Sequence, residues 1–293
     1  MSLLSALKAD RVEGHPFPHI VATEGLEPAF VRQLERECPP FEVLTRGRAG
    51  RSNQKFLWAA HRALRDPALS ATWRRLFREL VAPESWGQWL RLFRAQLLAE
   101  YPDFEARFGP LDALRIGVRD VDDGSRCDVL LDAKIVAHAP VAGPATTERG
   151  PHVKILRTLF YGYLYLGGDA DGSASVDHVL YSIRPGVEPA FDDTQATDPA
   201  GLHVQRVVPY RRGTLIALMN SPRSIQGLTA RAPSPRPMLA FHFTAHVRAP
   251  LFDLKMKPGA RPIRMEDARW YRRSPRSLLA GAWRRAAALA ARA

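Results

Sequence analysis

The feature that most constrains the fold is a series of short, apolar, strand-like segments that begins near residue 111. Turn residues such as Arg184-Pro185-Gly186 separate these segments, and no helical pattern interrupts the series. The absence of alternating strands and helices disfavours a doubly wound parallel sheet, and seven or more closely connected strands indicate a sandwich or a barrel. The predicted strands are 114–118, 129–137, 159–166, 176–183, 202–208, 214–220 and 238–247.

The first third of the chain has a helical pattern instead. Apolar and aromatic residues recur there at helical spacing, a pattern typical of helices that pack on a core. One predicted helix begins after Leu26 and ends at Pro39-Pro40, because consecutive prolines cannot continue a helix. The other predicted helices cover residues 54–64, 70–82 and 85–101.

The last predicted strand has two different faces. Because side chains alternate along a strand, Leu239, Phe241, Phe243 and Val247 share one face. This apolar face can pack on the N-terminal helices. The opposite face is mixed, and we expect it to line a polar cavity with Arg236, Met238, Ala240, His242, Thr244 and His246.

Most of the positive charge lies at the C-terminal end. The 293 residues include 42 Lys+Arg and 30 Asp+Glu, a formal net charge of +12. A strongly basic balance is one mark of nucleic-acid-binding proteins. Residues 255–293 contain eleven basic and two acidic residues, however, and so carry +9 of this charge. The rest of the chain is nearly balanced, and we expect no nucleic-acid partner.

Residues 277–293 have the pattern of a basic amphipathic helix, with an apolar stripe that includes Leu278, Leu279 and Trp283. We expect this helix to dock on its own domain or on a second copy of the chain in a homodimer. Binding to an anionic membrane surface or to a partner groove is the alternative.

Cysteine content and hydropathy predict a cytoplasmic protein. Cys38 and Cys127 lie far apart and are the only cysteines, which disfavours a disulfide scaffold. No apolar run approaches the about 18–20 residues that a membrane span needs. The N-terminus also lacks the long apolar stretch and small-residue cleavage site of a signal peptide.

Two stretches carry a resemblance to a known family. The first is Gly150-Pro151-His152-Val153-Lys154 with the apolar strand that follows it, and the second covers 210–231 and ends with Pro235-Arg236. With the lead-in Phe17-Pro18-His19-Ile20, these stretches resemble bacterial, prolyl-hydroxylase-like members of the 2-oxoglutarate/Fe(II) oxygenase superfamily. The resemblance implies an α+β chain with a mostly β core. That core would be a double-stranded β-helix (jelly-roll or cupin-like) with a helical N-terminal elaboration and a C-terminal helix.

The resemblance also implies positions for an iron site. In the family, a His-x-Asp/Glu pair and a distal histidine hold Fe(II), and an arginine about ten positions further on binds 2-oxoglutarate. Here the first histidine is His152 and the arginine is Arg236, but Lys154 stands at the carboxylate position and Gln226 at the distal histidine. His138 stands where relatives carry an asparagine and is a second cofactor-binding candidate.

These replacements predict an altered site. An ammonium beside a dication is strongly repulsive in a poorly hydrated cavity, and an amide oxygen is a weaker ligand for iron than imidazole. We expect no metal, with His152, Lys154 and Gln226 as the candidate catalytic residues. The Lys154 ammonium would replace the metal and pair with an anion whose other end meets Arg236; alternatively, its side chain extends out of the pocket.

A relocated metal ligand is a further alternative. His178, His203, His242 and His246 are the candidates, and His242 has the best case because it shares a strand face with Arg236. If iron binds, His152 would hold it together with Gln226 or His242.

Three functions follow from these alternatives. The leading one is a degenerate oxygenase-like protein that binds a small anion or 2-oxo acid, or catalyses a non-oxidative biosynthetic step, without a cofactor. The second is an active Fe(II)/2-oxoglutarate dioxygenase with an atypical ligand set. The third is a scaffold for a partner protein.

The expected organisation is a helical elaboration over 1–110, the β-helix over 111–250 and a basic extension over 251–293.

Overall fold

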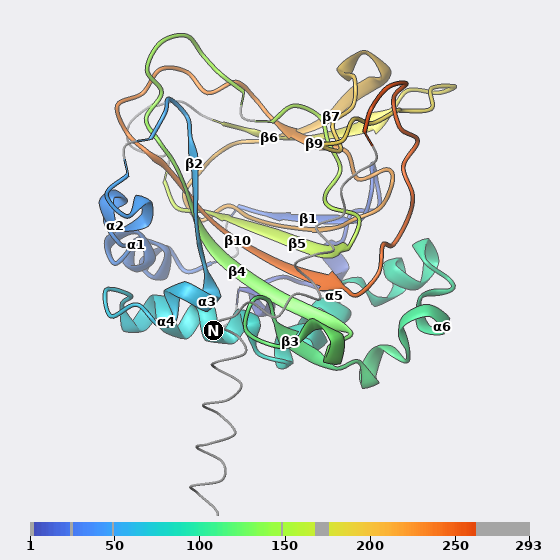
Figure 1. Ribbon diagram of the computed structural model, residues 1–293, viewed down its shortest axis with the longest axis horizontal. Coiled ribbons are helices and arrows are strands. Elements are labelled where there is room, and N and C mark those ends of the chain that lie inside the picture. Colours follow the sequence, from blue (N-terminus) through green and yellow to red (C-terminus); the bar gives the residue numbers. More distant parts are fainter. Residues whose placement is uncertain (1–2, 24–25, 49, 148, 168–175, 262–293) are drawn as a thin grey trace, which may run out of the picture.

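Two β-sheets face each other in the structure, and a layer of helices covers the outer face of the larger sheet (Figure 1). The structure is a computed structural model that describes residues 3–23, 26–48, 50–147, 149–167 and 176–261. The helix predicted over 277–293 lies outside the described residues. Within them, no helix is both long and apolar enough to cross a membrane.

The large sheet has seven strands and the small sheet three. The strand order of the large sheet is β1-β8-β5-β10-β4-β2, and β3 pairs with β4 in parallel while all other pairs are antiparallel. Its strands are β1 (His19–Ala22), β2 (Lys55–Ala59), β3 (Ile116–Val118), β4 (Val129–His138), β5 (Thr158–Tyr165), β8 (Leu215–Met219) and β10 (Met238–Val247). The small sheet has the antiparallel order β7-β6-β9, with β6 (His178–Ile183), β7 (Leu202–Val208) and β9 (Gln226–Leu228).

The path of the chain between the sheets defines a double-stranded β-helix. From β4 the chain crosses to an extended segment that ends at His152 and pairs with β9, the outer strand of the small sheet. It then returns to β5, crosses to β6 and β7, returns to β8, crosses to β9 and ends in β10. These are eight segments that wind between two sheets, the topology of a jelly roll. The predicted fold class, α+β with a mostly β core, is confirmed.

The helices occur mainly where the sequence predicts them. The predicted segments after Leu26, over 70–82 and over 85–101 correspond to α1, α4 and α5. Pro28 occupies the first turn of α1, where proline is tolerated, and the Ser70 hydroxyl caps α4 by accepting a hydrogen bond from the Trp73 amide. The helices are α1 (Pro28–Arg36), α2 (Phe41–Thr45), α3 (Ala60–Ala63), α4 (Ala71–Val81), α5 (Glu84–Glu100) and α6 (Phe104–Phe108).

The helix predicted over 54–64 is wrong for most of its length. Residues 55–59 form the edge strand β2, which pairs with β4, and only α3 is helical. The side chains of Phe56 and Trp58 are buried, whereas those of Lys55 and Leu57 are exposed. This alternation of buried and exposed side chains has the period of a strand. Five residues are too few, however, to distinguish a strand from a helix in the sequence when helix-forming alanines follow directly.

Aromatic packing joins the helix layer to the outer face of the large sheet. The ring centroids of Trp73 and Phe77 each lie 5.1 Å from that of Phe241, and Trp89 lies 5.6 Å from Phe243. This packing confirms the expected role of the apolar face of the last strand. The inner face of the sheet is thereby left for the pocket described below.

Gly162 of β5 gives a test of this packing. A Cβ atom added there would lie 2.2 Å from Cζ of Phe243, a contact that the close-packed ring cannot relieve by a rotamer change. We expect Gly162→Ala to lower the free energy of unfolding by about 2–3 kcal/mol in urea denaturation. The control Gly87→Ala lies in α5 with no atom within 4 Å of its added Cβ. It should be slightly stabilising, and wild-type stability of Gly162→Ala would contradict the packing argument.

Candidate functional site

Side chains on the inner face of the large sheet form rows that cross the strands. The register places Lys55, His138 and Met238 in one row across β2, β4 and β10. A second row crosses β4, β10 and β5 and joins Lys134, His242 and Tyr163. Apart from Lys134, the residues of these rows line the floor of a cavity whose opposite wall comes from the small sheet.

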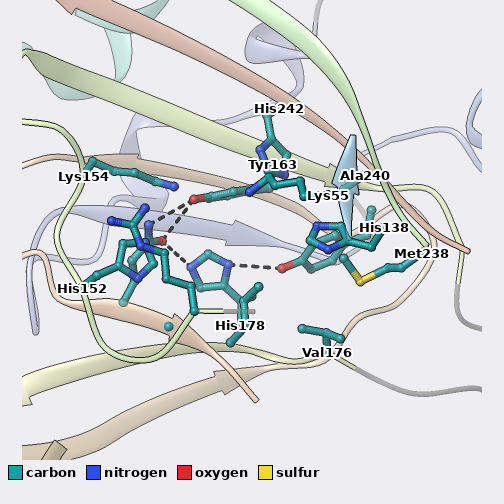
Figure 2. A pocket seen from close by; sticks show the side chains of 15 residues that line it. Lys55, His138, His152, Lys154, Tyr163, Val176, His178, Met238, Ala240 and His242 are labelled. Carbon is teal, nitrogen blue, oxygen red and sulfur yellow. Dashed lines mark hydrogen bonds between the residues drawn. The ribbon is translucent and has the colours of Figure 1, made fainter. Parts of the chain in front are cut away.

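The cavity is a pocket of about 520 Å³, its mouth included, between the two sheets (Figure 2). The predicted site residues His138, His152, Lys154, Gln226 and His242 all line it. They come from segments far apart in sequence, and the β-helix brings them together. The other polar lining residues are Lys55, Arg149, Tyr163, Tyr165 and His178.

The His152 and Gln226 positions are fixed by the backbone. The amide of His152 donates to the carbonyl of Gln226 at 2.8 Å, and the amide of Gln226 donates back at 2.9 Å. This reciprocal bonding makes the two residues a directly opposed antiparallel pair, so their side chains lie on the same face. Val153 points the other way, into a cluster with Phe191 and Ile225. The side chain of Lys154, two residues after His152, therefore returns to the pocket.

The side chain of Gln226 is engaged by its neighbours. Its Oε1 accepts a hydrogen bond from Nε2 of His178 at 2.6 Å, and its Nε2 donates to the hydroxyl of Tyr163 at 3.1 Å. With the proton of His178 on Nε2, Nδ1 can accept from the Tyr165 hydroxyl at 3.2 Å. Burial, followed by the nearby Lys154 ammonium, lowers the pKa of His178 to about 3. Gln226 thus belongs to a closed network around a neutral imidazole.

His152 has one satisfied ring nitrogen and one unsatisfied. Its Nδ1 lies 2.8 Å from the carbonyl oxygen of Gly150, an acceptor only, so Nδ1 carries the proton. Nε2 is then a bare lone pair. This atom is buried and has no hydrogen-bond partner in the part of the chain that the structure describes. Burial foremost, with the positive charges of Arg149 and Lys154, holds the pKa of His152 well below its ordinary value.

The ammonium of Lys154 points into the pocket (Figure 2). Its Nζ lies 5.3 Å from the ring centroid of Tyr161 and 5.1 Å from that of Tyr163, both within cation–π range. It also contributes to lowering the pKa of three pocket histidines, His152, His178 and His242. Of the two placements considered from the sequence, the structure has the one in which Lys154 stays inside.

The histidines proposed as relocated ligands are dispersed. His242 packs its ring on Tyr163 at 4.5 Å in the pocket, and burial lowers its pKa well below the ordinary value. His246 lies beyond the pocket and bonds the hydroxyls of Thr158 and Thr244. His203 is exposed on β7. Among the described residues, no three His, Cys, Asp or Glu side chains form a group that could hold a metal ion.

Arg236 is not brought to the pocket. It is exposed, and it is not among the lining residues. Its backbone carbonyl accepts a hydrogen bond from Arg231, a buried guanidinium that also donates to the carbonyl of Ala139 at 2.6 Å and to Oδ1 of Asn53 at 3.2 Å. Any contact between Arg236 and an anion in this pocket stays a prediction.

Several pocket residues were not predicted from the sequence. Lys55 was assigned to a helix, and only its register with His138 on β4 places it at the pocket. Tyr163 and Tyr165 alternate with outward-facing residues on β5, so strand parity could have identified them. Arg149 precedes the motif that contains His152, and no signal in the sequence distinguishes it.

The pocket side chains do not supply the donor set of the Fe(II) site that the resemblance implies. Lys154 is a cation, and the amide of Gln226 bonds His178 and Tyr163. His152 offers a buried imidazole nitrogen that has no partner among the described residues. Such an iron centre requires two imidazoles and a carboxylate, and Arg236, which the resemblance implies as the anchor for 2-oxoglutarate, does not line the pocket.

The pocket instead has a positive character. Lys55, Arg149 and Lys154 line it, and no described lining residue is an Asp or Glu. The low pKa values keep His152, His178 and His242 neutral at physiological pH, so they add hydrogen-bonding capacity without adding charge. A concave site with cations and polar neutral groups is suited to a small anion.

No model of a protein family matches the chain, and no curated protein matches it. Among solved structures, it is similar to the non-heme alpha ketoglutarate dependent epimerase SnoN from nogalamycin biosynthesis. The identity is 14% and the TM-score 0.45, over 93% of this chain and 94% of that one. A Pseudomonas putida prolyl-4-hydroxylase has 13% identity and a TM-score of 0.40, over 79% and 93% of the two chains. An oxidoreductase of the 2OG-Fe(II) oxygenase family from Burkholderia pseudomallei has 10% identity and a TM-score of 0.39, over 81% and 86%.

The chain is a double-stranded β-helix by its own strand order. What its pocket can do follows from its own residues.

Proposed function

We propose that this oxygenase-like protein binds a small organic anion in the pocket between its sheets and does not carry out iron-dependent oxidation. The observation that carries this proposal is the cation Lys154 in a pocket that no described Asp or Glu lines. The resemblance implies that Lys154 stands where the family has a ligand carboxylate. An enzyme of this kind would act on the bound anion by a non-oxidative step.

Charge compensation supports the proposal. Removing an ammonium from water is unfavourable, and the rings of Tyr161 and Tyr163 offset part of that cost. A carboxylate or another anion beside Lys154 would supply a charge-assisted hydrogen bond, which is about twice as strong as a neutral one. Lys55 at the mouth adds long-range attraction for the same ligands.

Calorimetric titration with acetate, malonate, 2-oxoglutarate, 2-hydroxyglutarate and phosphate tests the proposal. We expect at least one of these anions to bind, and Lys154→Met to weaken that binding at least tenfold, because the substitution keeps the side-chain volume and removes the charge. The control Lys8→Met removes an exposed lysine outside the pocket and should leave the affinity unchanged. Failure of all five anions to bind the wild-type protein would refute the proposal.

The alternative function, Fe(II)/2-oxoglutarate oxidation with an atypical ligand set, has a separate test. The protein is incubated with Fe(II) and 2-oxoglutarate, and bound iron and oxygen-dependent succinate release are measured. Stoichiometric iron with turnover would establish the oxygenase and overturn the proposal. We expect neither, because an ammonium in the pocket repels a dication, and the resemblance implies that Lys154 stands at the carboxylate position.

A further inference from the structure

We propose that the anion is a 2-hydroxy acid, whose hydroxyl donates to Nε2 of His152 while its carboxylate binds the ammonium of Lys154. This inference rests on the proposed function and specifies the ligand class of the same pocket. It also predicts that the pocket binds 2-oxo acids, the ligands that the family resemblance implies, more weakly than 2-hydroxy acids.

The unsatisfied nitrogen of His152 carries the argument. The bond from Nδ1 to the Gly150 carbonyl leaves Nε2 as an acceptor, and this atom is buried without a partner among the described residues. A buried acceptor without a hydrogen bond is unfavourable, and most such groups in folded proteins are paired. The side chain is only 4% exposed and lines the pocket, so a partner must come from within the pocket. Whatever binds there must therefore offer a proton donor.

None of the described neighbours of His152 donates a hydrogen bond to its Nε2. The Tyr163 hydroxyl and the Gln226 amide bond each other, and the protonated nitrogen of His178 is used by Gln226. Rearranging this network to reach His152 would leave another buried polar group unsatisfied, at a similar cost. A ligand that carries its own donor satisfies Nε2 without disturbing these bonds.

The arrangement of His152 and Lys154 fits adjacent functional groups on one small molecule. The two residues are two positions apart on an extended segment, about 6–7 Å between Cα atoms, and both side chains enter the pocket. Lys154 is close enough to lower the pKa of His152. In a 2-hydroxy acid the hydroxyl and the carboxylate are on neighbouring carbons, so one can meet the imidazole while the other meets the ammonium.

A 2-oxo acid matches the same cation but not the imidazole. Its carbonyl oxygen is an acceptor and would face the lone pair of Nε2, which leaves both acceptors unsatisfied. A site built to bond a hydroxyl discriminates strongly against an analogue that lacks it, because its own buried polar group then stays unpaired. We therefore expect 2-hydroxy acids to bind at least tenfold more tightly than their 2-oxo counterparts.

The test uses ligand pairs that differ only at this group. Calorimetry compares each enantiomer of 2-hydroxyglutarate with 2-oxoglutarate, and each enantiomer of lactate with pyruvate, on the full chain with EDTA present. At least tenfold tighter binding of one hydroxy acid in either pair supports the inference. Equal binding, or tighter binding of the oxo acid, overturns it, as does failure of both pairs to bind. The proposed function survives each of these overturning results as long as another anion in the panel binds.

Variants of His152 test whether this residue causes the preference for hydroxy acids. In His152→Phe the acceptor is lost, so the hydroxy and oxo acids should bind equally while Lys154 retains both. His203→Phe removes an exposed histidine of β7 and should keep the full preference. If His152→Phe does not fold, His152→Gln is used in its place. The glutamine amide can donate to a 2-oxo group as well as accept from a hydroxyl. The preference for the hydroxy acid should therefore fall at least fivefold. A preference that persists unchanged in the folded variant overturns the assignment.

Discussion

The double variant Lys154→Asp with Gln226→His is expected to bind Fe(II) with micromolar or tighter affinity, where the wild-type protein binds none. The substitutions supply a carboxylate and a second imidazole beside His152, whose Nε2 is already buried, unprotonated and without a partner among the described residues. The reciprocal backbone bonds of His152 and Gln226 hold the positions of both imidazoles. Two imidazoles and a carboxylate on one side of the metal form the donor set of non-heme iron centres.

Equilibrium dialysis followed by metal analysis measures this gain, and thermal denaturation checks that the variant folds. Each single variant provides a control: Lys154→Asp lacks the second imidazole, and Gln226→His keeps the repulsive ammonium. Both should bind Fe(II) at least a hundredfold more weakly than the double variant. A double variant that folds and stays free of metal would show that residues 154 and 226 do not occupy the ligand positions.

Arg231→Met is expected to destabilise the protein by about 2–4 kcal/mol through the loss of its hydrogen bonds. Arg231 is 2% exposed, and its guanidinium bonds Ala139, Asn53 and Arg236. It thereby links the segment before β2 and the ends of β4 and β10. Methionine fills much of the volume but removes all three hydrogen bonds, including the one to the buried carbonyl of Ala139.

Urea denaturation monitored by circular dichroism measures the loss. Arg78→Met is the matched control, because it makes the same replacement at an exposed position of α4. The control should change stability by less than about 0.5 kcal/mol. Similar stabilities for the two variants would mean that the buried guanidinium contributes nothing through its hydrogen bonds.

The architecture could be predicted because it depends on long, regular patterns. The ten residues of β10 and the seventeen of α5 show clear periodicity, and both were predicted to within two residues. The strands β1, β2 and β9 were missed. They have three to five residues each, and their strand character comes from pairing with distant segments rather than from their own pattern.

The residues that line the candidate site could be predicted from the sequence, but the hydrogen bonds among them could not. The motif and strand parity identified His152, Lys154, Gln226 and His242 as neighbours, and all four line the pocket. The hydrogen bond between Gln226 and His178, by contrast, depends on the pairing of β9 with β6 in the small sheet. The exposure of Arg236 depends equally on three-dimensional contacts, since the neighbouring Arg231 occupies the buried position. The local sequence does not indicate such contacts between distant segments.

The separation of the two faces of the large sheet affects how this protein can acquire new specificities. The helix-packed core lies on one face and the pocket on the other, so Phe241 and His242 are adjacent in sequence but serve different purposes. Backbone bonds, rather than the pocket side chains, hold the His152 and Gln226 segments together. A library of replacements on the inner face would therefore sample ligand chemistries on a scaffold whose helix-packed core lies on the opposite face. In such a protein, the binding site can diverge faster than the fold.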